Sequence, residues 1–243
     1  GGTGQTFTIG GSLIINSSTS VLSIANGTST GNILNVGSWI QTAGTFNPNI
    51  GTSTTVAINF TNANGTFTQS SESTLTNTYI NWTVNSDKSL TLNNDLPVAS
   101  SRSLTVNGTL DCGTKLVSGA GAFTLSAGAT LKTANATGVN GSITVSGTKT
   151  LNIAANYVFN GTTAQVTGTL MPSTVNNLTI DNAAGVTLTN SPQIVSGSLQ
   201  INSGGIINVS AAKQLTVTGA LTNNGTLNLL SSVDGTATII TGS

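Results

Sequence analysis

The heptapeptide LTVNGTL at positions 104–110 decides the fold, because a close copy, LTVTGAL, returns at 215–221. Its first five positions occur again as ITVSG at 143–147 and as FTIGG at 7–11. Each copy begins apolar–polar–apolar, which on a β-strand sends the two apolar side chains to one face and the polar one to the other. The polar residue and glycine that follow predict a turn, because asparagine and glycine tolerate positive φ. The sequence therefore predicts short strands separated by tight turns.

A glycine followed by a small residue and then a large apolar one recurs along the whole chain. Three intervals between successive glycines lie within one residue of 21, another interval of 43 is close to twice that length, and the rest are irregular. A loose period of this size is typical of solenoids. The ten glycines are Gly11, Gly44, Gly65, Gly108, Gly121, Gly141, Gly168, Gly197, Gly219 and Gly225.

The composition excludes a helical protein. Charged residues make up 5% of the 243 residues, against about 25% in ordinary soluble domains. Threonine (44), serine (29) and asparagine (29) take their place, and glutamate occurs once. Helix-favouring residues are therefore scarce, whereas threonine, valine and isoleucine suit the half-buried surface of a sheet.

Two all-β architectures fit these strands: a parallel β-helix, and a β-sandwich or tandem Ig-like array. The repeat near 21 and the lack of charge favour the β-helix, because its coils stack equal positions about 4.8 Å apart, where like charges repel and asparagine ladders form. We predict a parallel β-helix (β-solenoid) of eleven or twelve coils, a single repetitive segment over residues 1–243. The chain begins with Gly1 rather than Met, so we expect a fragment of a longer protein.

Charge and hydropathy argue against two classes of partner. The net charge is zero and the six basic residues are scattered singly, so we expect no nucleic acid partner, which normally requires a basic stripe. No apolar run approaches the length of about 18 residues needed to span a bilayer, so we expect no membrane insertion. The basic residues are Lys88, Arg102, Lys115, Lys132, Lys149 and Lys213.

Familiar catalytic and metal-binding patterns are missing from the sequence. Without histidine, a His-based triad or zinc site cannot form. Of the carboxylates only Asp87 and Asp95 lie near each other, and we expect both to cap turns. We predict no enzyme activity, no catalytic residue, no cofactor and no metal. The lone Cys112 is expected to be a buried small apolar residue.

Aromatic residues are the best candidates for carbohydrate contact. Aromatic rings stack on sugars, so the candidate contact residues are Trp39, Trp82 and Tyr79. By alternation Ile80, Trp82 and Val84 share one face, so we expect Trp82 in the core and Tyr79 pointing outward. The predicted carbohydrate contacts are therefore Tyr79 and Trp39.

The chain contains slightly more Asn-x-Ser/Thr sites than chance predicts for its high content of asparagine, serine and threonine. Their number alone therefore does not indicate glycosylation. The twelve sites are at Asn16, Asn26, Asn59, Asn64, Asn81, Asn107, Asn135, Asn140, Asn160, Asn177, Asn208 and Asn224.

Three stretches carry a family resemblance: NNLTIDNAAGVTL at 176–188, GSLQI at 197–201 and GALTNNGTL at 219–227. They resemble the β-strand-repeat regions of very large surface proteins and adhesins from Bacteroidota, which are typically exported by the type IX secretion system. The resemblance is strong over residues 100–243 and thinner over 1–100. It implies an extracellular stalk or adhesive surface, and it transfers no catalytic residue.

We therefore predict a secreted structural or adhesive segment of a cell-surface protein, acting as a rigid stalk or as a self-stacking fibre unit. Its expected partners are a second copy of itself, stacked end to end, or a surface polysaccharide. Two alternatives stay open. A carbohydrate-binding module predicts an exposed aromatic row, and a β-helix polysaccharide-degrading enzyme predicts clustered carboxylates in a groove.

Overall fold

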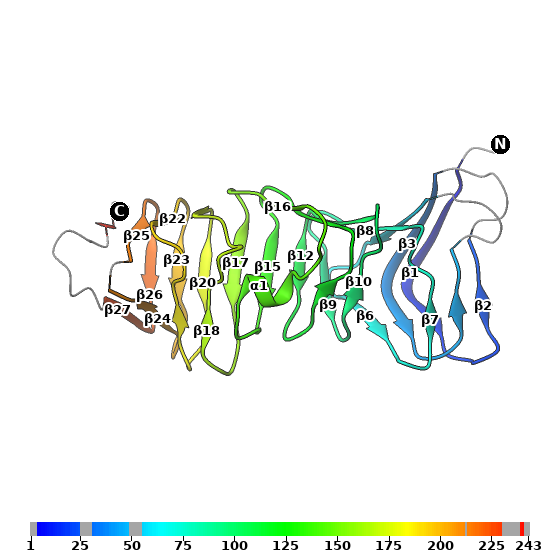
Figure 1. The fold of residues 1–243 in the computed structure, drawn as a ribbon, viewed down its shortest axis with the longest axis horizontal. Coiled ribbons are helices and arrows are strands. Elements are labelled where there is room, and N and C mark those ends of the chain that lie inside the picture. The colour runs from blue at the N-terminus through cyan, green and yellow to red at the C-terminus, as the bar shows by residue number, and fades with distance from the viewer. Residues whose placement is uncertain (1–3, 25–30, 49–54, 212, 230–238, 241–243) are drawn as a thin grey trace. The chain divides into compact units, whose positions relative to one another are not determined.

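The computed structural model describes residues 4–24, 31–48, 55–211, 213–229 and 239–240. Its stacked parallel strands form a β-solenoid of about nine turns (Figure 1). The predicted parallel β-helix is confirmed, whereas the sandwich alternative fails, because neighbouring strands such as β5 and β8, or β20 and β23, pair in parallel. The described part of the chain contains one short helix, α1 (Val139–Ser142).

The number of turns is smaller than the predicted eleven or twelve because many coils are longer than 21 residues. Hydrogen bonds between neighbouring coils join Asn59 to Asn35, 24 positions apart, and Thr66 to Ser38, 28 positions apart. Later in the chain Ser198 bonds to a residue 21 positions before it. The turns absorb the extra residues, so the strands stay in register while the sequence period drifts.

The chain divides into two compact units. The first comprises the described residues within Gly1–Asp111, Lys115–Thr124 and Thr144–Thr150, and the second those within Cys112–Thr114, Leu125–Ile143 and Leu151–Ser243.

In the first unit three parallel ladders run from coil to coil. The first half of β3 pairs with β5 and its second half with β6, and these ladders continue through β8 and β11 and through β9 and β12. A third ladder joins β2, β4 and β7. The strands are β1 (Thr6–Ile15), β2 (Val21–Leu22), β3 (Asn32–Gln41), β4 (Thr45–Phe46), β5 (Val56–Phe60), β6 (Gly65–Gln69), β7 (Thr74–Leu75), β8 (Ile80–Val84), β9 (Ser89–Leu92), β10 (Leu96–Pro97), β11 (Ser103–Val106), β12 (Thr109–Asp111) and β13 (Val117–Ser118), with most of β14 (Ala122–Leu125) and β16 (Lys149–Leu151).

The second unit repeats the three-ladder pattern with shorter strands. Strands β20, β21 and β22 form one complete coil, and each pairs in parallel with its equivalent in the next coil, β23, β24 and β25. The strands are β15 (Thr130–Thr133), β17 (Asn156–Phe159), β18 (Gln165–Val166), β19 (Thr174–Val175), β20 (Leu178–Ile180), β21 (Val186–Thr187), β22 (Gln193–Val195), β23 (Leu199–Ile201), β24 (Ile206–Val209), β25 (Leu215–Val217), β26 (Leu221–Asn223), β27 (Thr226–Leu229) and β28 (Ile239–Ile240).

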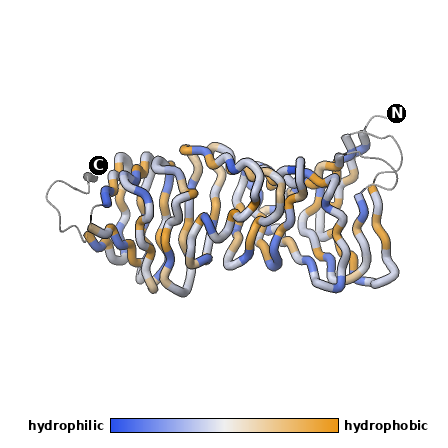
Figure 2. Tube along the Cα trace, viewed as in Figure 1, coloured by the Kyte–Doolittle hydropathy of each residue, from blue (hydrophilic) through white to orange (hydrophobic). Residues whose placement is uncertain are grey.

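Side chains alternate between the interior and the surface, as the apolar–polar–apolar pattern predicts. Along β8 the residues Ile80, Trp82 and Val84 are buried, and the two between them are half-buried. Figure 2 shows the same alternation as orange and pale segments along the coils. The predicted core position of Trp82 is confirmed.

The repeated glycines are needed mainly for space. A Cβ on Gly108 would lie 2.2 Å from the carbonyl oxygen of Lys88 in the preceding coil, and one on Gly219 would lie 2.0 Å from a glycine carbonyl oxygen. Of the ten repeated glycines, all of them described, only Gly44 and Gly168 have positive φ. The predicted reliance on positive φ was therefore wrong for most copies, because it is the close approach of stacked coils that excludes a side chain.

The copy ITVSG at 143–147 differs from the others, since α1 precedes it and it forms no extended strand. Ile143 and Val145 are nevertheless buried, as their positions in the pattern predict. The backbone nitrogens of Thr144 and Ser146 still donate to carbonyl oxygens of Val117 and Gly119, at 2.9 and 2.8 Å. Coil-to-coil bonding therefore persists where regular strand geometry does not.

Candidate functional site

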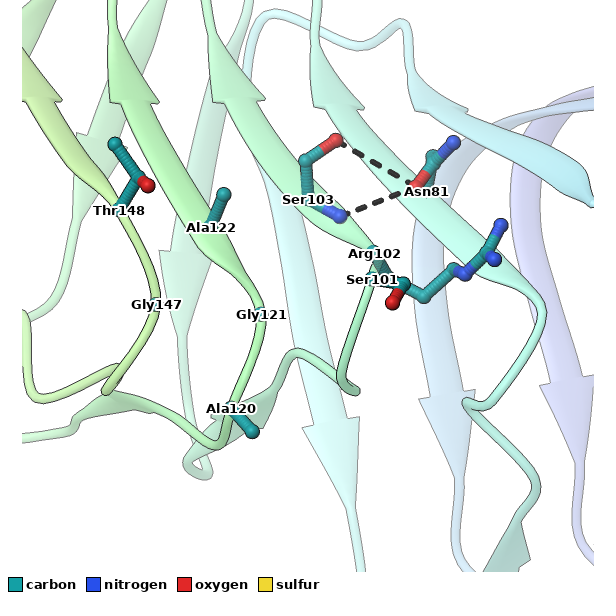
Figure 3. Close-up of a pocket in the computed structure, with 9 residues that line it drawn as sticks. All are labelled: Asn81, Ser101, Arg102, Ser103, Ala120, Gly121, Ala122, Gly147 and Thr148. Atoms are coloured by element: carbon teal, nitrogen blue, oxygen red, sulfur yellow. Dashed lines mark hydrogen bonds between the residues drawn. The ribbon is translucent and has the colours of Figure 1, made fainter.

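An open hollow of about 440 Å³ lies in the first unit, where the turns of successive coils lead into β8, β11, β14 and β16 (Figure 3). Its volume falls within the range of about 300–1,000 Å³ that is usual for small-ligand sites. The hollow is lined by Asn81, Ser101, Arg102, Ser103, Ala120, Gly121, Ala122, Gly147 and Thr148.

One wall of the hollow is held by a hydrogen-bonded pair from two neighbouring coils. The Oδ1 atom of Asn81 accepts hydrogen bonds from the backbone nitrogen of Ser103 at 3.1 Å and from its hydroxyl at 3.5 Å (Figure 3). Both residues lie on outward positions of parallel strands, because Trp82 and Leu104, which follow them, are paired and buried. The amide nitrogen of Asn81 has no hydrogen-bond partner among the described residues.

Arg102 supplies the only charge among the lining residues. Its Nη1 donates to the hydroxyl of Thr55, which immediately precedes β5. Because β8 lies between β5 and β11 in the sheet, this bond carries the Arg102 side chain across the β8 coil. The Nε atom is buried and has no hydrogen-bond partner within the described part of the chain. The guanidinium is thus directed toward β5, away from Ala122, Gly147 and Thr148 (Figure 3).

Small residues leave the space that the hollow occupies. A Cβ on Gly121 would lie 2.4 Å from Cγ1 of Val98, and one on Gly147 would lie 2.3 Å from the carbonyl oxygen of Gly121. Coil stacking therefore excludes side chains at both positions. With Ala120 and Ala122 beside them, these glycines form a shallow floor of backbone and methyl groups.

Chemically, the hollow offers hydroxyl, amide and backbone groups that can form hydrogen bonds. None of its lining residues carries a carboxylate or a thiol. The sequence analysis missed Arg102, which it counted only as one of six scattered basic residues. The available signal was that Arg102 is the one arginine of the chain, set between two serines.

The two predicted carbohydrate contacts, Trp39 and Tyr79, differ in burial. Trp39 is fully buried, with its ring centroid 4.7 Å from that of Phe46 and 5.7 Å from that of Trp82, so it presents no face to a sugar and this prediction is corrected. The reason is that Trp39 lies on an inward position of β3, where alternation alone could not separate it from its neighbours. Tyr79 is half-buried in the turn before β8, two residues before Asn81, but it does not line the hollow.

The remaining residues singled out from the sequence occupy structural positions. Asp87 lies in a turn with a φ of 59°, and the Oδ1 atom of Asp95 accepts a hydrogen bond from the backbone nitrogen of Leu116 at 2.9 Å. Cys112 is buried, as predicted. The glycosylation-type site at Asn26 lies outside the described residues.

The N-terminal coil of the first unit exposes apolar side chains. Phe7, Ile14 and Val21 are 61%, 57% and 65% exposed. Phe7 pairs in register with Leu34, which is only 1% exposed, so Phe7 occupies an interior position that no described coil covers. Among the described strands, β1 pairs only with β3, which leaves its other edge free for pairing.

In the second unit, Gln165 is the centre of a buried hydrogen-bond network. The Nε2 atom of Gln165 donates to the carbonyl oxygens of Thr133 and Asn135, and its Oε1 accepts from Gly161 and Asn182, at distances of 2.8 to 3.1 Å. All four side-chain hydrogen-bonding positions of this glutamine are therefore used, and none remains for a ligand.

The hydroxyl of Tyr157 is an exception in the second unit. The side chain is buried and its oxygen has no hydrogen-bond partner among the described residues. Burial raises the pKa of the Tyr157 hydroxyl well above its ordinary value of 10.0, because the apolar surroundings disfavour the charged form. This group stays neutral in the folded protein.

Comparisons with known proteins place no relative beside this chain. No family model, curated protein or solved structure matches it. Within the described residues, no helix has the length and apolar character to cross a membrane. No cluster of three or more histidine, cysteine, aspartate or glutamate side chains suited to a metal ion occurs in that same part of the chain.

Proposed function

We propose that the chain is a structural and adhesive segment of an extracellular surface protein, acting as a stiff spacer. The observation that supports this proposal is the parallel register that most paired strands keep from coil to coil within each unit. Strands such as β5, β8 and β11 pair residue for residue, and each coil buries its apolar face against its neighbours. Short-range stacking of this kind makes a solenoid stiff without a single large core.

The outward rows carry side chains that stack without repulsion. In the first unit Thr8, Asn35, Asn59, Thr83 and Thr105 stand in one register. Within this row the Nδ2 atom of Asn59 donates to Asn35 at 3.0 Å, and the Nδ2 atom of Asn35 donates to Thr8 at 3.2 Å. Such ladders tie the coils together at the surface.

The second unit has equivalent ladders. The Nδ2 atom of Asn177 donates to Asn156 at 2.9 Å, and the Nδ2 atom of Asn228 donates to Asn208 at 2.9 Å. The surface location of the parent protein is part of the proposal, and the likeness of residues 176–188, 197–201 and 219–227 to the repeats of exported Bacteroidota surface proteins supports it.

Distance measurements between spin labels test the stiffness of each unit. Labels on cysteines at Thr8 and Thr105 are four coil steps apart in one row, which gives about 19 Å between backbones at about 4.8 Å a step. Labels at Thr130 and Ala220 test the second unit over the same number of steps. We expect narrow distance distributions for both pairs, whereas broad ones would contradict a stiff spacer.

A second candidate function is end-to-end self-association, which the exposed N-terminal coil favours. Both outer coils present parallel strand edges, since β1 pairs only with β3, and β26 and β27 pair only with β23 and β24 among the described strands. A second copy adds a parallel coil at the N-terminal edge and covers Phe7. Such head-to-tail contacts do not close and produce filaments.

Electron microscopy over a range of protein concentrations tests this second candidate. Filaments that lengthen with concentration and disappear on Phe7→Asn support it. A chain that stays monomeric at every concentration refutes self-association and leaves the spacer role untouched.

A further inference from the structure

We propose that the hollow and a row of threonines beside it bind a neutral, extended polysaccharide. This proposal deepens the adhesive part of the proposed function and rests on it, whereas the spacer role is independent of it. All the residues concerned belong to the first unit. Three features support a site of this kind: two rows of outward side chains without charge, hydrogen-bonding groups that the fold leaves unused, and a hollow that coil stacking keeps open.

Four side chains from successive coils form the first row, on β8, on β11, on β14 and directly before β16. They stand side by side on one surface of the sheet (Figure 3), and all four line the hollow. They are Asn81, Ser103, Ala122 and Thr148. The row itself carries no charge, because the guanidinium of Arg102 is directed away from Ala122 and Thr148. Ala122 is the smallest member and leaves a gap between its two hydroxyl-bearing neighbours.

A row of threonines borders the first row, two residues further along each strand. Thr83 and Thr105 are register partners, and the hydrogen bonds that join β14 to its neighbours β11 and β16 place Thr124 and Thr150 in the same row. Within β8, β11 and β14 the residues on both sides of the threonine are buried, so these threonines face outward. Thr150 is exposed. The second row therefore presents hydroxyl and methyl groups and no charge.

The fold leaves the hydroxyls of the threonine row unused. In the preceding coils the same row contains Asn35 and Asn59, whose side chains bond to each other at 3.0 Å. From Thr83 onward, the side chains of the row have no hydrogen-bond partner among the described residues. In the first row the hydroxyl of Thr148 is likewise unpaired within that part of the chain, and only the Oδ1 atom of Asn81 is bonded. These groups are available to a ligand.

Groups of this kind select a neutral ligand that is rich in hydroxyls. Threonine hydroxyls both donate and accept hydrogen bonds, as the hydroxyls of a sugar do. A polyanion finds no cation in either row, and an apolar ligand finds no apolar side chain larger than alanine. A peptide strand finds no free edge, because β8, β11 and β14 each pair on both sides. A neutral polysaccharide is the polymer whose chemistry matches both rows.

The rows also indicate the shape of the ligand. Equal positions of successive coils are about 4.8 Å apart, so an extended chain laid along the rows meets one coil after another. A bent chain leaves the rows after a short contact. The hollow is preformed, because a Cβ on Gly121 or Gly147 would lie within 2.4 Å of Val98 or of a backbone carbonyl oxygen. Binding therefore requires little ordering of the protein.

Calorimetric titration with four defined oligosaccharides tests the proposal. Cellohexaose is neutral and extended, and maltohexaose contains the same sugars in a bent chain. Cellobiose is the short form of the extended chain, and a mannuronic acid hexamer is the charged probe. We expect cellohexaose to bind, and each of the other three to bind at least about tenfold more weakly, the factor that corresponds to the loss of about two hydrogen bonds.

Two variants locate the site. Ala122→Gln places a longer side chain in the gap of the first row and is expected to weaken cellohexaose binding at least about tenfold. The double variant Thr105→Val, Thr124→Val removes two hydroxyls that the fold does not use. It is expected to weaken binding about tenfold while the melting temperature stays near that of the wild type.

Thr179→Val is the matched control, because Thr179 is an outward threonine of β20 in the second unit. This variant is expected to bind cellohexaose as the wild type does. Thermal unfolding of each variant verifies that it is folded.

Several outcomes overturn the proposal. Absence of cellohexaose binding by the folded wild-type protein refutes it, as does unchanged binding by the folded double variant. Equal affinity for cellobiose or maltohexaose contradicts an extended chain along the rows, and equal affinity for the mannuronic acid hexamer contradicts a neutral ligand. None of these results bears on the spacer role, which the distances between spin labels test separately.

Discussion

The two units build the same coil with different interiors. The first encloses a cluster of aromatic rings. The ring centroid of Trp82 lies 5.7 Å from that of Trp39, 6.0 Å from that of Phe60 and 5.8 Å from that of Phe67. The second stacks mainly aliphatic side chains, such as Leu178 and Leu199, in register.

The ring cluster of the first unit coincides with long coils. Around the ring cluster, hydrogen-bonded neighbours are 24 to 28 positions apart, whereas in the later coils of the second unit they are 20 or 21 apart. A longer coil encloses more space, and interiors are packed to nearly constant density. The second unit also buries two rings, Tyr157 and Phe159, on β17. There the step from the preceding coil is again long, at 26 positions.

Buried amides differ from one site to another. Gln41 in the first unit donates to the carbonyl oxygens of Gly44 and Thr74, but its Oε1 has no hydrogen-bond partner among the described residues. Gln165 in the second unit uses all four of its hydrogen-bonding positions. Gln193, also in the second unit, resembles Gln41, because its Oε1 has no hydrogen-bond partner among the described residues. The complete network is therefore specific to the coils around Gln165, where the step to Thr133 is 32 positions.

The largest expected effect comes from removing the central ring. Trp82→Ala is expected to lower the free energy of unfolding by about 3–5 kcal/mol, because it leaves a cavity lined by three other rings. Urea unfolding followed by tryptophan fluorescence measures this directly. Both tryptophans of the chain lie in the first unit, so Trp39 continues to report on that unit. A loss below about 1 kcal/mol would contradict the role assigned to the ring cluster.

The next largest effect is expected from replacing a buried glutamine amide. Gln165→Met is expected to cost about 3 kcal/mol, because it leaves the N–H groups of Gly161 and Asn182 without this buried acceptor. The carbonyl oxygens of Thr133 and Asn135 keep their backbone donors. Gln41→Met is the matched variant in the first unit, and its cost is expected to be clearly smaller, since fewer partners are lost. Circular dichroism during urea unfolding measures both. Equal losses in the free energy of unfolding would show that the two amides stabilise the fold to the same extent.

Replacing a repeated glycine by alanine is expected to lower stability by a similar amount in both units. Gly108→Ala and Gly219→Ala should each cost about 1–3 kcal/mol, because the added methyl group meets a carbonyl oxygen of the preceding coil. Gly10→Ala is the control, since a Cβ there meets no atom within 4 Å, and it is expected to stay within about 0.5 kcal/mol of the wild type. Melting temperatures rank the three variants.

The smallest expected effect concerns Tyr157 and alkaline pH. Because the pKa of the buried hydroxyl is raised above 10.0, the folded state keeps its proton where the unfolded chain loses it. Stability is therefore unaffected below pH 10 and falls as the pH rises beyond it, by about 1.4 kcal/mol per pH unit. Tyr157→Phe is expected to remove this part of the decline. Identical pH dependence in wild type and variant would show that the hydroxyl ionises freely in the fold.

The fold was predictable from the sequence because its determinants are local. The alternation in 104–106 and 215–217 specifies strands, and β11 and β25 form there. The number of turns was not predictable, since residues added in turns leave the strand pattern intact. The reason for the glycines was also hidden, because the clash of Gly108 with Lys88 is a contact between coils.

The candidate site was less predictable than the fold. Aromatic chemistry directed attention to Trp39, which is buried where the alternation along β3 is interrupted. Arg102 gains its position from Thr55, 47 positions away, and no local pattern connects the two. Residues that act across several coils leave no signal in a single repeat.

Disulfide cross-linking of paired positions tests the parallel register most directly. With Cys112 replaced by alanine, cysteines are placed at Thr83 and Thr105 in the first unit and at Thr179 and Gln200 in the second, which are register partners in adjacent coils. Partners about 4.8 Å apart lie within disulfide reach, so both pairs are expected to oxidise readily. The shifted pair Thr83 and Ser103 is expected to stay reduced. Efficient cross-linking of the shifted pair, or none in the register pairs, would contradict the stacked-coil account.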